Sequence, residues 1–228
     1  MRRLPIIAAG LFGLSAPALA DVTLHYGPVG DSNQRLTIEA DAAGNLRAEA
    51  GPGQIILIRA DGEAYLAVPG DQEEFARMDD YLALIEAHRR AHPHPDVQPR
   101  LPGHYALEAR GEEQVGPWRG TRFVLAETGA QAHPLEQDAV ISTDPVLAEA
   151  GRAARRVFAA QGRAAAAMFG GGRDDYMRLA DEMYGRGLAL RVSVIYRLES
   201  MSTAPVPAGR FAIPAHLLSR EELAERLH

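Results

Sequence analysis

The sequence contains no cysteine, and this absence excludes several classes of site together. A chain without cysteine forms no disulfide bond, no cysteine-ligated zinc site and no thiol nucleophile. It also lacks the N-terminal cysteine on which a lipoprotein anchor is built. Any special chemistry must therefore come from other side chains.

The sequence also lacks an N-terminal apolar run of the length that a membrane helix needs, about 20 residues. The apolar run 4–14 follows two arginines and precedes small residues that end in the pattern A-x-A at position 20. A basic start, a short apolar core and this ending are typical of a secretory signal peptide. We predict that residues 1–20 are a signal peptide cleaved before Asp21. The mature chain is expected to be periplasmic and not an integral membrane protein.

Positive charge is in deficit. The formal net charge of the chain is −6, and removing two arginines with the signal peptide lowers it to −8. An acidic balance argues against nucleic acid or an anionic membrane as the main partner. The 208 residues that remain suffice for one large domain, which we place at 21–228.

Sequence motifs of catalysis and cofactor binding are missing as well. The chain has no lysine, so Gly170–Gly172 lacks the Gly-Lys-Ser/Thr ending of a phosphate loop and is interpreted as a helix stop. No G-x-S-x-G nucleophile motif occurs. We therefore predict no catalytic residue, no cofactor and no enzymatic activity.

A group of histidines leaves a metal site as an alternative. Imidazole and carboxylate groups suit zinc, copper or nickel, and His88, His92 and His94 are followed by Asp96. Pro93 disfavours a helix that would carry the first two histidines on one face. We interpret the His-Pro-His-Pro segment as a stiff solvated linker and predict no metal ligands, with metal binding as the alternative.

What the sequence does contain is a strong period of two. In Leu188–Leu198 (L-A-L-R-V-S-V-I-Y-R-L) apolar residues fall on alternate positions. Successive side chains of a strand point to opposite faces, so this pattern predicts one long antiparallel strand with an apolar face that needs a cover.

Shorter alternating segments surround it, separated by turn residues such as Asp61-Gly62 and a predicted turn at Gly111–Gln114. The expected strands are Val22–Tyr26, Gln34–Ala40, Leu46–Ala50, Gln54–Ala60, Glu63–Val68, Tyr105–Ala109, Trp118–Glu127, a strand at Val140 and a last one at Arg210–Pro214. Helical spacing predicts helices over Asp71–Ala91, from Pro145 to about Ala160 with an extension or restart to Phe169, around Tyr176–Tyr184, and over Ser219–Leu227. The fold class is α+β.

Three segments resemble a known group when taken together. They are the hairpin Ile55–Val68, the segment Gly111–Glu127 with its Trp and Gly, and the finish from Gly187–Arg191 to Phe211–Pro214. Their order is similar to that in uncharacterised periplasmic proteins of the LolA/LolB-like superfamily, which includes outer-membrane lipoprotein carriers. The resemblance implies a curved antiparallel sheet, an open half-barrel, with helices covering its concave face.

Such a concave face is a candidate site for an acyl chain or another hydrophobic ligand, and the implied partners are a lipid or an acylated protein. The residues that we place on it are Leu36, Ile38, Tyr65, Trp118, Phe123, Leu190, Val192, Val194 and Tyr196. The alternative is that these side chains pack against the helices and fill the space. In that case the chain is a ligand-free module that docks on an envelope protein partner.

Overall fold

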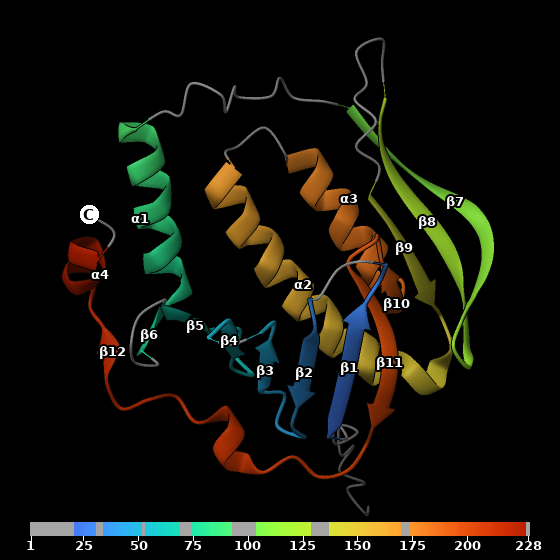
Figure 1. Ribbon diagram of the computed structural model, residues 1–228, viewed down its shortest axis with the longest axis horizontal. Coiled ribbons are helices and arrows are strands. Elements are labelled where there is room, and N and C mark those ends of the chain that lie inside the picture. The colour runs from blue at the N-terminus through green and yellow to red at the C-terminus, as the bar shows by residue number, and fades with distance from the viewer. Residues whose placement is uncertain are drawn as a thin grey trace, which may run out of the picture.

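Twelve strands form one open sheet, mostly antiparallel, with four α-helices in the described part of the chain (Figure 1). The structure is a computed structural model that describes residues 21–30, 34–51, 53–68, 74–92, 104–128, 137–169 and 174–226. The strands are β1 (Val22–Pro28), β2 (Leu36–Ala40), β3 (Leu46–Glu49), β4 (Ile55–Ile58), β5 (Ala64–Val68), β6 (Glu74–Arg77), β7 (His104–Val115), β8 (Trp118–Thr128), β9 (Gln137–Ser142), β10 (Leu188–Val192), β11 (Tyr196–Ser202) and β12 (Leu217–Leu218). The helices are α1 (Met78–Ala91), α2 (Ala148–Phe169), α3 (Asp174–Gly185) and α4 (Arg220–Arg226), with 3₁₀ turns η1 (Pro145–Leu147) and η2 (Ala208–Phe211). The predicted α+β class is confirmed.

The strand order is β12-β6-β5-β4-β3-β2-β1-β11-β10-β9-β8-β7. Strands β1 to β6 are sequential antiparallel neighbours, because short turns connect most of them. Strand β11 then pairs with β1 and joins this first meander to the run formed by β7 to β10. Residues from both ends of the chain therefore lie side by side in the middle of the sheet.

Alternating side chains of the central strands build the main core. Leu36 and Ile38 of β2 lie opposite Tyr26 and Leu24 of β1, and all four side chains are buried. Thr37 and the other intervening residues of β2 are only partly covered. The period of two in the sequence therefore corresponds to one buried face, as predicted.

Three helices pack on that same face of the sheet. α1 contacts β5 and β6, α2 contacts β1, β2, β3 and β10, and α3 contacts β7 and β8. The helical segment predicted from Pro145 begins with an N-cap, because the Asp144 carboxylate accepts a hydrogen bond from the Val146 N–H at 2.9 Å. The helix that follows continues without a break to Phe169.

A smaller cluster lies on the opposite face. Ile55, Leu57, Tyr65, Ala67 and Phe75 are buried together, and Ile213 and Leu217 pack against them. The connection from β11 to β12 carries these two residues across to the far edge of the sheet, where β12 pairs with β6 in parallel (Figure 1). This connection includes η2, not the strand predicted at Arg210–Pro214, and the last strand is β12.

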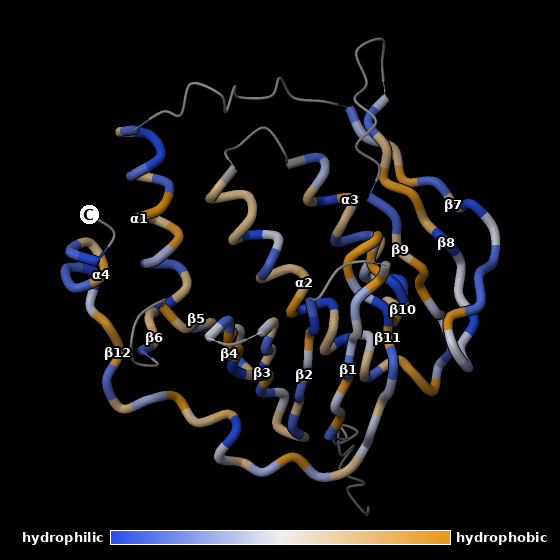
Figure 2. The backbone as a smooth tube through the Cα atoms, viewed as in Figure 1, coloured by the Kyte–Doolittle hydropathy of each residue, from blue (hydrophilic) through white to orange (hydrophobic). Residues whose placement is uncertain are grey.

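The other edge of the sheet is hydrophilic. Strand β7 is coloured mainly as hydrophilic in Figure 2, and Glu108, Arg110 and Glu112 on it are exposed. Charged side chains on an edge strand discourage pairing with a further strand from another molecule. The turn predicted at Gly111–Gln114 is instead a β-bulge within β7, with Gly111 at φ +92°, and the hairpin turns at Gly116.

The long strand predicted at Leu188–Leu198 is wrong, because the segment is a hairpin. Ser193 has a φ of +45°, and the Ile195 N–H donates to the Val192 carbonyl at 3.1 Å, so the chain reverses between β10 and β11. Val192 lies directly opposite Tyr196 across this hairpin, and opposed residues face the same side. A three-residue turn preserves the phase of the alternation, so the sequence pattern looks like one continuous strand.

The start of the helix predicted at Asp71 is also wrong. Phe75 belongs to β6, where it pairs with Ala67, and α1 begins only at Met78. The helical spacing of Met78, Leu82 and Ile85 is genuine, but Phe75 satisfies it by coincidence. Pairing with β5 decides its conformation.

Candidate functional site

Most of the residues predicted on the covered face lie there. Leu36, Ile38, Phe123, Leu190, Val192 and Tyr196 are buried in the main core beneath the helices, and Trp118 is partly buried against it. The structure corrects the placement of the other two. Tyr65 belongs to the cluster on the opposite face, because it alternates with Leu66. Val194 lies in the β10–β11 turn with 74% of its surface exposed, outside either face of the sheet.

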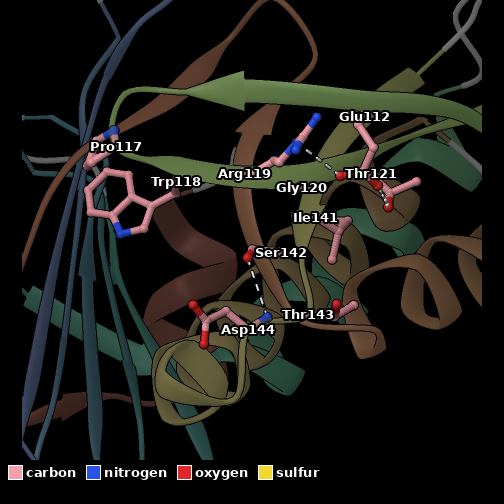
Figure 3. Close-up of a pocket in the computed structure, with 10 residues that line it drawn as sticks. All are labelled: Glu112, Pro117, Trp118, Arg119, Gly120, Thr121, Ile141, Ser142, Thr143 and Asp144. Atoms are coloured by element: carbon pink, nitrogen blue, oxygen red, sulfur yellow. Dashed lines mark hydrogen bonds and ion pairs between the residues drawn. The ribbon is translucent and has the colours of Figure 1, made fainter.

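Two pockets are candidates for a site in the described residues, and the first is a polar trough near the β7–β8 turn. Figure 3 shows Trp118, Glu112 and Asp144 around this space of about 390 Å³. Its polar groups bind one another: Thr121 donates to Glu112 at 2.9 Å, and Asp144 caps η1. Because these polar groups already have hydrogen-bond partners, the trough offers a ligand few free donors or acceptors.

The second pocket lies between α2, α3 and the β10–β11 hairpin and has a volume of about 400 Å³; we call it the α2–α3 pocket. Its walls are mainly apolar and aromatic. They comprise Phe158, Ala159, Gly162, Ala165 and Ala166 of α2, Tyr176, Met177, Ala180 and Tyr184 of α3, and Gln137, Val192, Ile195 and Tyr196 of the sheet and its turn, with Arg155, Gln161, Arg163 and Asp181 also lining it. Two residues of the predicted set, Val192 and Tyr196, therefore line this pocket.

Packed aromatic rings support one side of this pocket. The rings of Phe158 and Tyr184 stack with centroids 4.9 Å apart. Tyr26 meets Phe158 and Tyr196 edge-on, with centroid distances of 6.1 and 6.4 Å. Rings in such geometry attract one another beyond the area that they bury, so these contacts stabilise this wall of the pocket.

Three tyrosines in or beside the pocket, Tyr26, Tyr184 and Tyr196, have uncharged phenol groups. Burial raises the pKa of Tyr26, with a smaller contribution from Tyr184, far above the usual range of tyrosine. Burial likewise raises the pKa of Tyr184, although a hydrogen bond from Gln137 at 3.2 Å opposes the rise. Burial also raises the pKa of Tyr196. These side chains therefore act as neutral hydrogen-bonding groups at any physiological pH.

An ion pair joins the two helices beside the pocket. Arg155 of α2 donates to both carboxylate oxygens of Asp181 on α3, at 2.9 and 2.7 Å. This hydrogen bonding raises the pKa of Arg155 and lowers that of Asp181. Both side chains are about half exposed, so the ion pair adds little to the stability of the fold and serves mainly to position α2 and α3 relative to each other.

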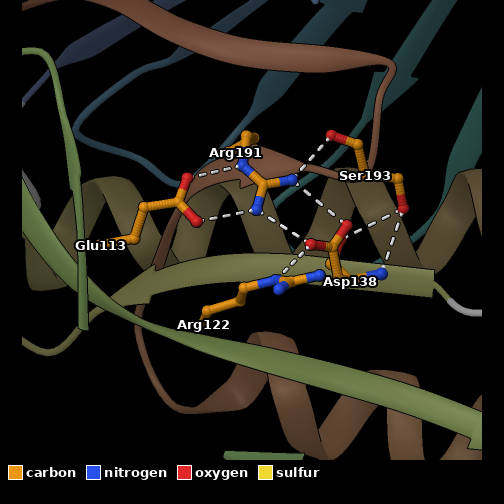
Figure 4. A network of polar contacts seen from close by, with 5 residues as sticks. All are labelled: Glu113, Arg122, Asp138, Arg191 and Ser193. Carbon is orange, nitrogen blue, oxygen red and sulfur yellow. Dashed lines mark hydrogen bonds and ion pairs between the residues drawn. The ribbon is translucent and has the colours of Figure 1, made fainter. Parts of the chain in front are cut away.

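A second polar network lies on the side of the sheet away from α2. Because Leu190 and Val192 point into the main core, Arg191 between them points to the opposite face. Figure 4 shows its guanidinium between Glu113 and Asp138, with Arg122 bound to the same aspartate at 2.7 Å. Two cations and two carboxylates satisfy one another, so this cluster is structural and presents no unbalanced charge to a ligand.

The alternative of a metal site at the histidines has no support in the described residues. His88 and His92 stack with ring centroids 4.5 Å apart at the end of α1. Within the described residues no group of three or more His, Asp or Glu side chains is arranged to hold a metal ion. His94, Asp96 and Gly170–Gly172 lie outside those residues.

The chain was also compared with known proteins. It matches no protein-family model, no curated protein and no solved structure. Where the structure describes the chain, none of its helices has both the length and the apolarity that crossing a membrane requires.

The residues of α2 and α3 that line the pocket were not predicted from the sequence. Small side chains on α2 leave the space open, notably Gly162, Ala165 and Ala166. A Cβ atom on Gly162 would lie 2.5 Å from the Met177 Cε atom, so its absence lets α3 approach. The signal was present in the alanine-rich stretch 164–167, but small residues indicate a cavity only when the opposing element is known.

Proposed function

We propose that this chain is an exported periplasmic binding protein that holds an acyl chain or another hydrophobic ligand in the α2–α3 pocket. The observation that carries the proposal is a pocket of about 400 Å³ with mainly apolar walls between α2, α3 and the β10–β11 hairpin. Ligand pockets usually have volumes of about 300–1,000 Å³ and combine apolar walls with few polar groups. A fully packed core would leave no such space.

Within this proposal the sheet is the curved half-barrel of the LolA/LolB-like superfamily, and α1, α2 and α3 lie over its concave face. Support comes from the single sheet with both edges open and from three helices packed on one face. A lipid, or a protein that carries an acyl chain, is the partner that such a pocket suits. Cleavage of the predicted signal peptide before Asp21 places the mature domain in the periplasm.

The rival interpretation, a ligand-free interaction module, requires an exposed apolar patch. Four large apolar side chains are exposed in the described residues: Val146, Met168, Val194 and Ile195. The first two lie at opposite ends of the η1–α2 segment, and the other two form the β10–β11 turn. These positions do not form one continuous surface, so no observation favours the module over the pocket.

Binding is tested on delipidated protein with the neutral fluorescent probe N-phenyl-1-naphthylamine, displaced by saturated fatty acids of 8 to 16 carbons. Each buried methylene contributes about 0.8 kcal/mol, which is about fourfold in affinity. We expect the dissociation constant to fall by about this factor per methylene until the pocket is full, and then to level off. Absence of saturable binding by the probe and by every acid would overturn the proposal.

A pocket-filling variant locates the site. Ala166→Phe places a ring in the α2–α3 pocket and should weaken binding on the order of tenfold, because it displaces about two methylenes. Ala148→Phe is the matched control, since Ala148 begins the same helix, is exposed and does not line the pocket. Equal affinities of the two variants would place the ligand elsewhere.

A further inference from the structure

We propose that the α2–α3 pocket selects ligands whose head group is uncharged and both donates and accepts hydrogen bonds, such as a hydroxyl, and that Gln137 and Tyr196 contact this head. The inference rests on the proposed function, because it concerns the same pocket. It adds a chemical class to a site that otherwise recognises only apolar surface.

Gln137 supplies an acceptor without a partner. Its Nε2 atom donates to the Tyr184 hydroxyl at 3.2 Å, whereas its Oε1 atom is buried and accepts no hydrogen bond within the described residues. A buried amide oxygen without a donor is costly, and native structures rarely leave one unsatisfied. Since Gln137 lines the pocket, a small turn of its amide lets a bound ligand supply the missing donor.

Tyr196 supplies the complementary group. Its side chain lines the same pocket and is 9% exposed, and its hydroxyl makes no hydrogen bond with another described residue. Tyr26, which packs against it edge-on, instead donates its hydroxyl to the Ala189 carbonyl at 2.8 Å. Burial raises the pKa of Tyr196 further above its usual value of about 10, so at neutral pH its hydroxyl is protonated and offers a donor as well as an acceptor.

The charges around the pocket argue against an anionic head. Both arginines that line it are paired: Arg155 with Asp181 at 2.7 Å, and Arg163 with Asp79 at 3.2 Å. A carboxylate has acceptors only, so it leaves the Gln137 Oε1 atom without a donor and adds a second negative atom beside it. A hydroxyl has a donor for the Gln137 Oε1 atom and an acceptor for the Tyr196 hydroxyl, and it brings no charge to desolvate.

The test compares three ligands with ten-carbon chains: 1-decanol, decanoate and decyl methyl ether. Each displaces N-phenyl-1-naphthylamine from the full mature chain at pH 7.4. For the unmodified protein we expect 1-decanol to bind about 3- to 10-fold more tightly than the ether, which accepts but does not donate, and more tightly than decanoate.

Two variants assign the preference to its residues. Gln137→Leu should bring the alcohol and the ether to within about twofold of each other, and Tyr196→Phe, which removes one oxygen, should reduce the alcohol's advantage over the ether. Gln54→Leu, at an exposed glutamine outside the pocket, should behave like the unmodified protein. Thermal melts show whether each variant is folded. If Gln137→Leu does not fold, the ratio of alcohol to ether binding in Tyr196→Phe tests the head-group proposal instead.

The outcomes are distinguishable. Equal binding of the alcohol and the ether to the unmodified protein overturns the head-group proposal, while probe binding that is sensitive to Ala166→Phe leaves the proposed function intact. Tightest binding of decanoate also overturns it, because the pocket would then present donors or a cation. If the probe and all three ligands fail to bind, the proposed function itself is wrong.

Discussion

Arg191 and Asp138 are joined by two hydrogen bonds, with Nη2–Oδ2 at 2.9 Å and Nη1–Oδ1 at 3.2 Å. The same guanidinium binds both carboxylate oxygens of Glu113, at 2.9 and 3.0 Å. Arg122 completes the group, so the four residues come from the four adjacent strands β7 to β10. The β-bulge before Glu112 bends β7 and brings Glu113 within reach. We infer that this network holds together the half of the sheet that supports α3.

Asp138→Asn should destabilise the protein in a pH-dependent way. Burial alone raises the pKa of Asp138, but hydrogen bonds from Arg191 and Arg122 outweigh it, and the pKa of this carboxyl is lowered. A lowered pKa means stability that is present above the unfolded value, about 4, and is lost as pH falls through the folded value. We expect urea unfolding to show a loss of about 1–3 kcal/mol at pH 7 that shrinks below about pH 4.

The control for this prediction is Asp79→Asn. Asp79 also binds an arginine, Arg163, but 86% of its side chain is exposed. Exposed pairs contribute little, so the change should stay below about 0.5 kcal/mol. Equal losses in both variants, or a loss in Asp138→Asn that is independent of pH, would contradict the role assigned to the network.

Tyr26→Phe tests the hydrogen bond in the centre of the main core. It leaves the Ala189 carbonyl without its donor, which should cost about 1–3 kcal/mol of unfolding free energy at pH 7. The pKa of Tyr26 is raised by burial, so its contribution is fully present below the unfolded value of about 10 and is lost as pH rises above it. The unmodified protein should therefore lose more stability than Tyr26→Phe between about pH 10 and 12. Parallel curves would show that Tyr26 ionises freely in the folded state.

Gly187 marks a close approach between the start of β10 and the end of β9. A Cβ atom there would lie 2.0 Å from the Ser142 carbonyl oxygen, and backbone cannot yield as a side-chain tip does. Gly187→Ala should cost about 1–3 kcal/mol or more in urea unfolding. Gly209→Ala is the matched change, since no atom lies within 4 Å of its added Cβ, and it should be neutral or stabilising by up to about 1 kcal/mol. A tolerated Gly187→Ala would mean that the two strands separate easily.

Arg156 of α2 links the helix to two turns of the sheet. Its guanidinium donates to the Gly44 carbonyl in the β2–β3 turn at 2.6 Å and to the Arg59 carbonyl in the β4–β5 turn at 2.5 Å. The point charge of a lysine does not reproduce this fork, so Arg156→Lys should lower the midpoint of urea unfolding by an amount equivalent to about 1–3 kcal/mol. Arg152→Lys, at an exposed position paired with Glu149, should change it by less than about 0.5 kcal/mol.

The proposed export of the chain gives a prediction that is independent of the pocket. The Asp21 carboxylate accepts hydrogen bonds from the Ala42 and Val206 N–H groups at 2.8 and 2.7 Å, so the residue after the predicted cleavage point is tied to the fold. Expressed in a Gram-negative bacterium, the chain should be released by osmotic shock with an intact mass that begins at Asp21. Ala20→Arg should block this processing because the cleavage site needs small residues. An uncut chain retained in the cytoplasm would refute the signal peptide.

The sequence by itself determined the local features of this protein, because each depends on residues close together in the chain. Alternation located β1 to β5, and helical spacing located α2 and α3. The last helix, predicted over Ser219–Leu227, begins with a capping box: the Ser219 N–H donates to Glu222 at 2.7 Å and the Glu222 N–H donates to the Ser219 hydroxyl at 3.2 Å. Such hydrogen bonds join residues within one turn of the chain, so the local sequence predicts them.

Only the tertiary structure decided the features that depend on a distant partner. Leu188–Leu198 became a hairpin because β9 and β1 pair with its two arms, and Phe75 joined a strand because β5 lies beside it. Tyr65 faces the smaller cluster because pairing sets which side of β5 meets the helices. The α2–α3 pocket exists because small residues of α2 oppose aromatic residues of α3, a match that is encoded in neither helix alone.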